Sequence, residues 1–286
     1  MNRERLRLIV LTQGGCELAI RRLLDLDCAE LSSIFIETDI LRHRSLRQKI
    51  ARSIRYDGYA ATAGKFARKM LGMSGLYDEG IRALTHGRNQ LREMANENGI
   101  PVHFVANYHD EHSIALMRAA NSDLGIVLGT NILRESVFKI PRLGSINLHQ
   151  GLAPYYRGGP SVFWELTNGE REVGLTVHFV ASKVDTGDII VQRTVPLEYD
   201  YSHQLDYEAF IDEYRQKLTA PSADLVAEAV RMIAEGTASP RPQDTTLGKR
   251  YKLPTKREKD ELRRRLRERR RVQAGYALPH RANSGD

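Results

Sequence analysis

The sequence predicts an α/β protein in which a parallel sheet carries helices on both faces. Two observations support this fold class. Short apolar runs rich in β-branched and aromatic residues alternate with segments whose apolar residues recur at helical spacing. The composition, with 41% hydrophobic and 28% charged residues, is that of a soluble globular protein. Ligands of such sheets bind beyond the carboxyl ends of the strands, so residues that follow strands are the first candidates for a site.

The expected strands and helices follow one another along the chain. Residues 6–15 form an apolar run that ends in two glycines, which is typical of a buried strand followed by a turn. Further strands are expected at residues 31–38, 100–106, 123–130, 144–150, 173–182 and 189–197. Helices are expected at residues 16–26, 86–99, 110–122, 203–218 and 222–236.

Two segments depart from this alternation. In residues 42–75, apolar positions such as Ile50 and Ile54 are spaced helically among many arginines, which predicts a basic helical insertion. From Lys249 a charged helix is expected, followed by an end rich in Gly, Ser and Asn that we expect to be frayed. We therefore divide the chain into a main domain at residues 1–197 and a helical extension with a basic tail at residues 198–286.

The net charge of +7 is unevenly distributed along the chain. Residues 41–71 hold nine Lys and Arg against one acid, and residues 249–273 hold thirteen against four. The rest of the chain is therefore net acidic. Basic patches of this kind bind phosphates, nucleic acid or an anionic membrane surface, or they are simply solvated helix faces.

The sequence also favours a compartment. It has no run of about 18 or more apolar residues, so no membrane span is expected. The apolar stretch at residues 8–11 is too short for the core of a signal peptide. Cys16 and Cys28 are too few for a disulfide framework or a four-ligand zinc site. We expect a cytoplasmic protein with reduced thiols and no bound metal.

Three polar residues stand where a site is expected. Asn147 and His149 are two positions apart at the end of an expected strand, so they face the same side. Asp185 lies in a glycine-bearing loop between two expected strands. These three groups suit acyl transfer to an amine. The amide would stabilise an oxyanion, the imidazole would move protons, and the carboxylate would orient the imidazole and raise its pKa. A hydrogen-bonded strand histidine and an ordinary turn aspartate are the structural alternatives.

Residues 147–190 resemble the core of the folate-dependent formyltransferase family, whose members formylate methionyl-tRNA, glycinamide ribonucleotide or amino sugars. The shared pattern is N-x-H, a proline-containing loop with Y-R-G, a Trp before N-G, then G-x-T-x-H and D-x-G. This chain matches it with Asn147, His149, Pro154, Tyr156, Arg157, Gly158, Trp164, Asn168, Gly169, Gly174, Thr176, His178, Asp185 and Gly187. The similarity extends more weakly over residues 5–197. It implies a Rossmann-like formyltransferase fold with residues 1–197 as the catalytic domain.

The resemblance implies roles for individual residues. Asn147, His149 and Asp185 would be catalytic, and 10-formyltetrahydrofolate would be the formyl donor. The pterin pocket would be lined by Asn131, Ile132, Leu133, Ala181, Ser182, Lys183, Val184, Thr186 and Gly187. The acceptor side would include Gln150, Arg157, Gly158 and Gly159, and the planar guanidinium of Arg157 would suit an acceptor phosphate or carboxylate. His178 is expected to be structural. Gln150 and Ala153 depart from the proline and leucine usual in the family, which would reshape the acceptor side.

The acceptor is the least determined part of the prediction. We expect formyl transfer to a primary amine of a small metabolite such as an amino sugar. The alternatives are transfer to methionyl-tRNA, hydrolysis of formyltetrahydrofolate, and nucleic-acid binding without catalysis. The tRNA alternative is disfavoured because residues 200–286 lack the strand and turn pattern of the C-terminal β-barrel that tRNA-formylating members typically carry. The basic segments 42–69 and 249–273 keep tRNA or another RNA open as a partner, and no oligomeric state is predicted.

Overall fold

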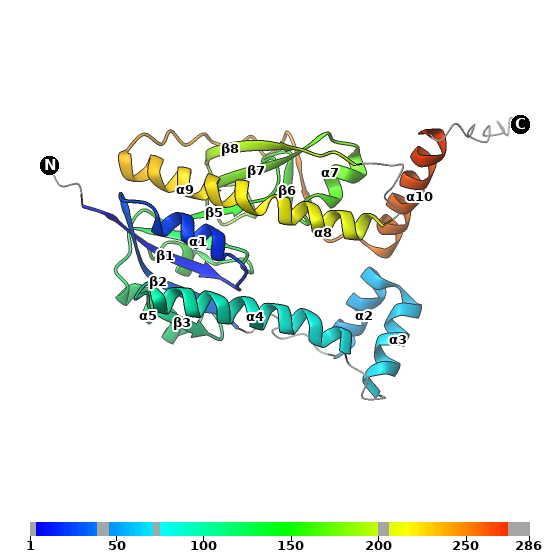
Figure 1. Cartoon of the computed structure of the whole chain (residues 1–286), viewed down its shortest axis with the longest axis horizontal. Coiled ribbons are helices and arrows are strands. Elements are labelled where there is room, and N and C mark those ends of the chain that lie inside the picture. Colours follow the sequence, from blue (N-terminus) through cyan, green and yellow to red (C-terminus); the bar gives the residue numbers. More distant parts are fainter. Residues whose placement is uncertain (1–3, 39–45, 71–74, 200–205, 274–286) are drawn as a thin grey trace, which may run out of the picture.

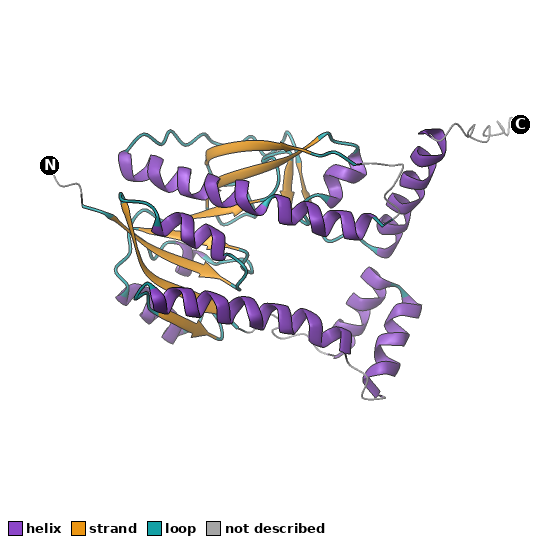
Figure 2. Ribbon diagram, viewed as in Figure 1, coloured by secondary structure: helices purple, strands orange, loops and turns teal. Residues whose placement is uncertain are grey.

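The computed structural model describes residues 4–38, 46–70, 75–199 and 206–273, which form a seven-stranded sheet with helices on both faces (Figures 1 and 2). The strand order is β3-β2-β1-β4-β5-β7-β8. The strands are β1 (Leu6–Thr12), β2 (Ala29–Glu37), β3 (Val102–Val105), β4 (Leu124–Leu128), β5 (Ser145–His149), β7 (Glu172–Phe179) and β8 (Ile189–Pro196). The predicted α/β Rossmann-like class is confirmed.

The sheet is mixed, whereas the sequence predicted a parallel one. Strands β1 to β5 are parallel to one another, but β7 pairs antiparallel with β5 and with β8. The loop between β7 and β8 holds no crossover helix, and strands joined without a crossover pair antiparallel. This reversal places β7 beside the end of β5, where the candidate residues lie.

Two apolar cores lie on opposite faces of the sheet. In β1, Leu8 and Val10 belong to one core and Ile9 and Leu11 to the other, because successive strand residues face opposite sides. Helices α1 (Glu17–Leu24), α4 (Gly75–Glu97), α8 (Tyr207–Lys217) and α9 (Thr219–Glu235) contribute to the first core. Helices α5 (Glu111–Ala119) and α6 (Glu135–Phe138) contribute to the second.

The basic insertion contains two helices, α2 (Leu46–Asp57) and α3 (Tyr59–Met70), as predicted. Parts of the predicted insertion, at 42–45 and 71–74, lie outside the described residues. Helix α4 begins at Gly75, well before the expected residue 86. Figure 1 shows α2 and α3 at one end of the molecule, next to α10 (Lys256–Gln273).

The C-terminal part differs most from the sequence prediction. Lys249 begins a short strand, β9 (Lys249–Tyr251), rather than a helix, and β9 pairs in parallel with β6 (Tyr156–Gly158). The partner strand lies more than ninety residues earlier in the chain, so no local periodicity announces this pairing. The expected frayed end at 274–286 lies outside the described residues.

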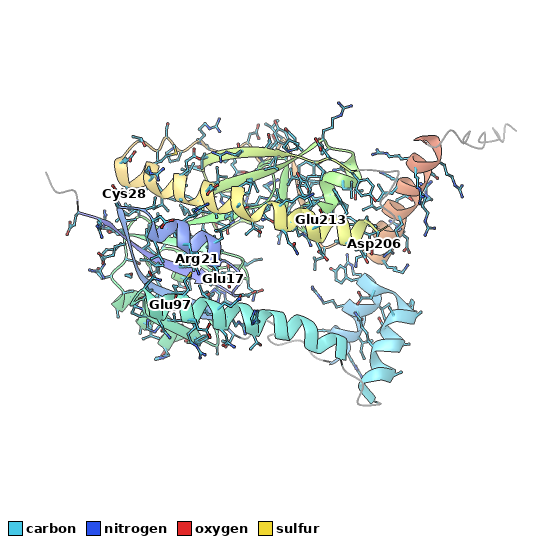
Figure 3. All side chains as sticks on the ribbon, viewed as in Figure 1. Glu17, Arg21, Cys28, Glu97, Asp206 and Glu213 are labelled. Carbon is cyan, nitrogen blue, oxygen red and sulfur yellow. The ribbon has the colours of Figure 1, made fainter. Side chains whose placement is uncertain are left out.

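Helices α8 and α9 join the main core rather than standing apart. Asp206, at the start of α8 in Figure 3, caps this helix by accepting hydrogen bonds from the backbone N–H groups of Glu208 and Ala209. Helix α9 packs against α1, β7 and β8. A division of the chain at residue 197 stays a prediction.

The described helices include none that is both long and apolar enough to span a membrane. Cys16 and Cys28 are both free thiols. The cytoplasmic location stays a prediction.

Candidate active site

The end of β5 brings two predicted residues together with a third that was not predicted. Strands β5 and β7 pair so that Asn147 lies opposite His178 and His149 lies opposite Thr176. The amide nitrogen of Asn147 lies 3.3 Å from Nε2 of His178. The strand order reverses between β1 and β4, and β5 ends beside this switch point, where α/β sheets bind ligands.

Asp185 reaches the same place from the loop between β7 and β8. Its carboxylate lies 3.5 Å from Nδ1 of His149 and 3.4 Å from Nε2 of His178, and it accepts a hydrogen bond of 2.8 Å from the backbone N–H of Gly158. The φ angle of Asp185 is +51°, in the left-handed region that asparagine and aspartate tolerate best. The carboxylate therefore sits between two imidazoles.

Gly187 allows the loop to approach β7 this closely. A Cβ atom at this position would collide with the carbonyl of Phe179. The glycine of the D-x-G pattern is thus required by backbone contact, whereas the aspartate contacts both imidazoles.

The ring of His149 faces hydrogen-bond acceptors on both sides. Nε2 lies 2.6 Å from the carbonyl oxygen of Tyr156, and Nδ1 faces Asp185. A neutral imidazole has one N–H and can donate to only one of them, whereas the charged ring would satisfy both. Burial opposes the charged ring, since His149 is only 8% exposed.

The opposing effects of burial and of the Asp185 charge leave the pKa of His149 below its ordinary value. Burial lowers the pKa, and the negative charge of Asp185 raises it by less. The predicted rise of this pKa is therefore wrong, because the sequence showed the carboxylate but not the burial. For Asp185, burial acts to raise the pKa, but contacts with His178, His149 and the Gly158 N–H outweigh it and bring the pKa to about 2.

His178 is the residue whose function the sequence analysis missed. Its Nδ1 lies 2.7 Å from the carbonyl of Phe179, and its Nε2 lies 3.3 Å from the amide nitrogen of Asn147 and 3.4 Å from the carboxylate of Asp185. His178 thus contacts both Asn147 and Asp185. The signal was present in the G-x-T-x-H pattern, but only the pairing of β5 with β7 shows which residue the histidine faces.

One pocket beside these residues has a volume of about 280 Å³. Asn147, His178 and Asp185 line it together with seven of the nine residues predicted for the pterin. Those seven are Asn131, Ile132, Leu133, Ala181, Ser182, Lys183 and Val184. Thr186 and Gly187 do not line it, and the hydroxyl of Thr186 instead donates to the carbonyl of Lys183. Ile132 is 64% exposed and offers an apolar surface at this pocket.

A narrow cleft of about 10 Å³, room for about one water molecule, lies on the other side of His149. It contains the residues predicted for the acceptor together with several that were not predicted for it. The predicted residues are Gln150, Arg157, Gly158 and Gly159, and the others include Trp164, Glu165 and Tyr251. The hydrogen bond from Gly158 to Asp185 connects this cleft to the first pocket.

Arg157 has a structural role that the sequence did not predict. Its guanidinium donates to the backbone carbonyls of Pro154, Thr245 and Gly248. These contacts attach the segment before β9 to the domain. Trp164 and Asn168 act similarly, since Trp164 Nε1 donates to the carbonyl of Lys252 and Asn168 donates to the hydroxyl of Tyr251.

The geometry suits transfer of an acyl group between two bound molecules. A carbonyl group in the first pocket would lie near the amide of Asn147, and an amine entering from the cleft would lie near His149. Among the described residues, no group of three or more His, Cys, Asp or Glu side chains is placed to hold a metal ion. The predicted lack of a metal stays a prediction.

Comparison with known proteins identifies relatives of this chain. Residues 85–219 match the family model described as formyl transferase. A methionyl-tRNA formyltransferase of Chlorobium chlorochromatii is 34% identical over 160 residues, which cover 56% of this chain and 48% of that protein. This chain thus spans about half the length of such curated relatives.

Solved structures share the fold. A glycinamide ribonucleotide transformylase of Geobacillus kaustophilus superposes with a TM-score of 0.53 at 16% identity, covering 81% of this chain and all of that one. A sugar N-formyltransferase of a Shewanella species superposes with a TM-score of 0.51 at 13% identity, covering 86% of this chain and 76% of that one. At these identities the likeness shows the fold alone.

Proposed function

We propose that this chain is a folate-dependent formyltransferase that transfers a formyl group from 10-formyltetrahydrofolate to a primary amine, a proposal supported by the match of residues 85–219 to the formyl transferase family model. Asn147, His149 and Asp185 are the catalytic residues in this proposal, and the observation that carries it is their position between two cavities. The pocket on one side is the proposed folate site, and the acceptor amine is proposed to reach His149 from the side of the cleft.

The residues of the first pocket fit a folate. Its two loops, 129–133 and 180–185, offer backbone N–H and carbonyl groups of the kind that a pterin ring pairs with, and the side chains of Ile132, Leu133 and Val184 offer apolar surface. Bound there, 10-formyltetrahydrofolate supplies the activated formyl group. The pterin-binding role of these loops remains part of the proposal.

The side chains act on the reaction in distinct ways. The amide of Asn147, which contacts His178, donates to the oxygen on which negative charge develops. His149 is neutral at physiological pH because burial lowers its pKa, and with its Nε2–H directed at the carbonyl of Tyr156 it takes up a proton from the attacking amine at Nδ1. Asp185 stabilises the imidazolium that then forms, since its carboxylate stays charged.

For the acceptor we propose a small metabolite amine. The described residues beyond 198 form α8, α9, α10 and one three-residue strand, which is not the strand-rich pattern of a β-barrel. The cleft holds only about 10 Å³ of open space and is closed on one side by β9, so it does not itself indicate the size of the acceptor. The lack of a barrel pattern among the described residues is the feature that favours a small acceptor such as an amino sugar.

Methionyl-tRNA is the second candidate acceptor. The curated relatives are methionyl-tRNA formyltransferases. The two basic segments also adjoin, since α2 packs against α10. A basic surface formed by both segments would suit RNA phosphates. The two candidates differ in the expected effect of salt, which is treated below.

The proposal is tested by following 10-formyltetrahydrofolate absorbance with and without amines. We expect tetrahydrofolate to form only when an amine is present. Asn147→Ala, His149→Ala and Asp185→Ala should each lower turnover about a hundredfold or more, as expected for loss of an oxyanion donor or proton-transfer group. Tetrahydrofolate formation without an amine would instead indicate a hydrolase, and near-full turnover of all three variants would reject the assigned residues.

A further inference from the structure

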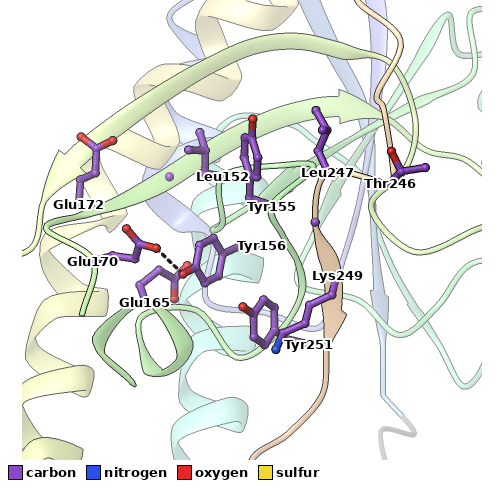
Figure 4. A pocket seen from close by; sticks show the side chains of 12 residues that line it. Leu152, Tyr155, Tyr156, Glu165, Glu170, Glu172, Thr246, Leu247, Lys249 and Tyr251 are labelled. Carbon is purple, nitrogen blue, oxygen red and sulfur yellow. Dashed lines mark hydrogen bonds between the residues drawn. The ribbon is translucent and has the colours of Figure 1, made fainter. Parts of the chain in front are cut away.

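A pocket of about 540 Å³ lies beside the catalytic cleft and is lined by carboxylates and aromatic rings (Figure 4). Glu165, Glu170 and Glu172 supply the carboxylates. The rings of Tyr156 and Tyr251, which stack at 5.1 Å, form an aromatic wall. Lys249 is the one basic residue among those that line it. This acidic pocket thus has three carboxylates and one ammonium among its side chains.

One carboxylate oxygen of Glu165 in this acidic pocket is buried without a hydrogen-bond partner. The Glu165 side chain is buried, with the residue only 2% exposed, and Oε2 is the oxygen that has no partner among the described residues. Figure 4 shows Glu165 directed toward Tyr156 and Glu170. The hydroxyl of Tyr156 already donates its proton to Glu170 at 2.7 Å. A buried acceptor without a donor is costly, so this oxygen is set to meet a donor that the chain does not supply.

The acidic pocket adjoins the catalytic residues. Glu165, Tyr156 and Tyr251 line both the acidic pocket and the cleft that contains His149. The backbone carbonyl of Tyr156 accepts the hydrogen bond from His149, while its ring faces the acidic pocket. A small molecule in the acidic pocket would thus lie next to the imidazole proposed to deprotonate the acceptor.

The charges in the acidic pocket favour a cation. The pKa of Glu165 is raised to about 7, and burial is the largest cause. The backbone N–H groups of Glu165 and Val162 and the charge of Arg215 act to lower this pKa, whereas the charge of Glu170 adds to the rise. A cationic amine would supply the missing donor and offset the repulsion between the two carboxylates. The Tyr251 ring already holds the ammonium of Lys249 at 4.6 Å from its centre, so the carboxylates are the groups left to attract a ligand cation. A phosphate would be repelled by the carboxylates of this pocket.

We propose that the acidic pocket binds the formyl acceptor, that this acceptor is a small amine that enters as its ammonium form and carries no phosphate, and that Glu165 accepts a hydrogen bond from it. The bound ammonium loses one proton to solvent before its nitrogen attacks, and His149 takes up the second. This inference rests on the proposed function and adds the chemical class of the acceptor. The competing explanation is that Glu165 only caps the first turn of α7 (Phe163–Asn168), on which it lies.

The experiment compares glucosamine with glucosamine 6-phosphate, which differ by one phosphate, as acceptors for the wild type and Glu165→Gln. We expect a KM at least about tenfold lower for glucosamine, and a rise of about tenfold in this KM in Glu165→Gln with little change in kcat, as for loss of a hydrogen bond to a charged group. The KM for 10-formyltetrahydrofolate should not change. Glu30→Gln, an exposed site on β2 with the same change of charge, should behave as the wild type.

Two outcomes would overturn the inference. One is a lower KM for the phosphate ester. The other is a Glu165→Gln protein with an altered melting temperature but an unchanged KM for glucosamine, as a purely structural cap would give. If the wild type formylates no amine, the proposed function fails, and calorimetric titration with glucosamine then tests the acidic pocket alone. Glucosamine binding that Glu165→Gln abolishes would support the pocket, and no binding would reject it.

Discussion

The pKa values of the neighbouring residues His149 and Asp185 are both lowered, that of His149 by burial and that of Asp185 by its contacts. Burial keeps His149 neutral into more acidic solution than a free histidine, while its contacts keep Asp185 charged. A neutral base beside a charged carboxylate is the state needed to accept a proton from an amine. This pairing depends on burial, which explains why the sign of the His149 shift was not predictable from the sequence.

The first residue-scale prediction concerns the rate at low pH. Because the pKa of His149 is lowered, we expect kcat/KM to fall on the acid side below about pH 6.5 as the imidazole becomes protonated. A pH profile measures this limb, which should disappear in His149→Ala. A further rise of the rate at higher pH, as the acceptor amine loses its proton and becomes nucleophilic, should persist in both proteins. An acid limb centred above pH 6.5 that His149→Ala removes would contradict the lowered pKa.

The second prediction concerns stability in acid. The folded-state pKa of Asp185, about 2, lies below its ordinary value of 3.8, so its contribution is present above pH 3.8 and is lost as the pH falls toward 2. The difference corresponds to about 2 kcal/mol. Urea unfolding at pH 6 and pH 3 should show a smaller loss of stability in Asp185→Asn than in the wild type. An equal loss in both proteins would show that other carboxylates cause the acid sensitivity.

The third prediction concerns Gly151, which lies under the ring of His149. A Cβ atom there would collide with Nε2 of His149 and with the carbonyl oxygen of Tyr156. Gly151→Ala should displace the ring and lower kcat by about tenfold to a hundredfold. Gly64→Ala is the matched control, since a Cβ at Gly64 meets no atom within 4 Å. Full activity of Gly151→Ala would mean that the hydrogen bond from His149 to Tyr156 is not needed.

At the scale of elements, the segment around β9 is held by residues of the family pattern. Arg157, Trp164 and Asn168 bind the backbone or side chains of residues 245–252. Gly158 also makes room for it, because a Cβ there would collide with the carbonyl of Tyr251. Removal of all residues after Gly248 would therefore cut through a packed strand, and it is not a neutral test of the basic tail.

The element-scale prediction uses Arg157→Ala. This change leaves carbonyls of Pro154, Thr245 and Gly248 without their charged donor, which should cost about 1.5–3 kcal/mol. Amide hydrogen exchange should increase at residues 245–252. Arg171→Ala, at an exposed position, is the control. If Arg157 instead holds an acceptor anion, its loss would raise the KM for an anionic acceptor and leave exchange at residues 245–252 unchanged.

At the scale of the whole molecule, the fold gathers two basic segments that are about 200 residues apart. Helices α2 and α10 pack together at one end (Figure 1). Several arginines of α10 are engaged within the helix, since Arg264 pairs with Glu261 and Glu268, and Arg265 pairs with Glu261. These pairs reduce the positive charge available to a polyanion.

The whole-molecule prediction concerns salt. A small acceptor should give a slope of the apparent affinity against log salt of about one or two at most, whereas RNA adds about 0.7–0.9 for each phosphate contact. The measurement is the transfer rate against salt for the wild type and for Arg267→Gln/Arg271→Gln, which removes two charges of α10. We expect shallow, equal slopes. A steep slope that this variant reduces would move methionyl-tRNA to first place.

The sequence alone determined the alternation of strands and helices, since apolar periodicity is a local property. It also placed Asn147, His149 and Asp185 at the ends of elements, because the family pattern is local in the chain. The structure shows these three residues together, with His178 added.

The tertiary structure decided what depends on contacts between distant segments. Burial set the sign of the His149 pKa shift, and β9 found its partner in β6. The same packing turned Arg157 inward onto backbone carbonyls and left one oxygen of Glu165 without a partner beside the cleft. Desolvation and pairing across more than ninety residues arise only when the chain is folded, so no local pattern encodes them.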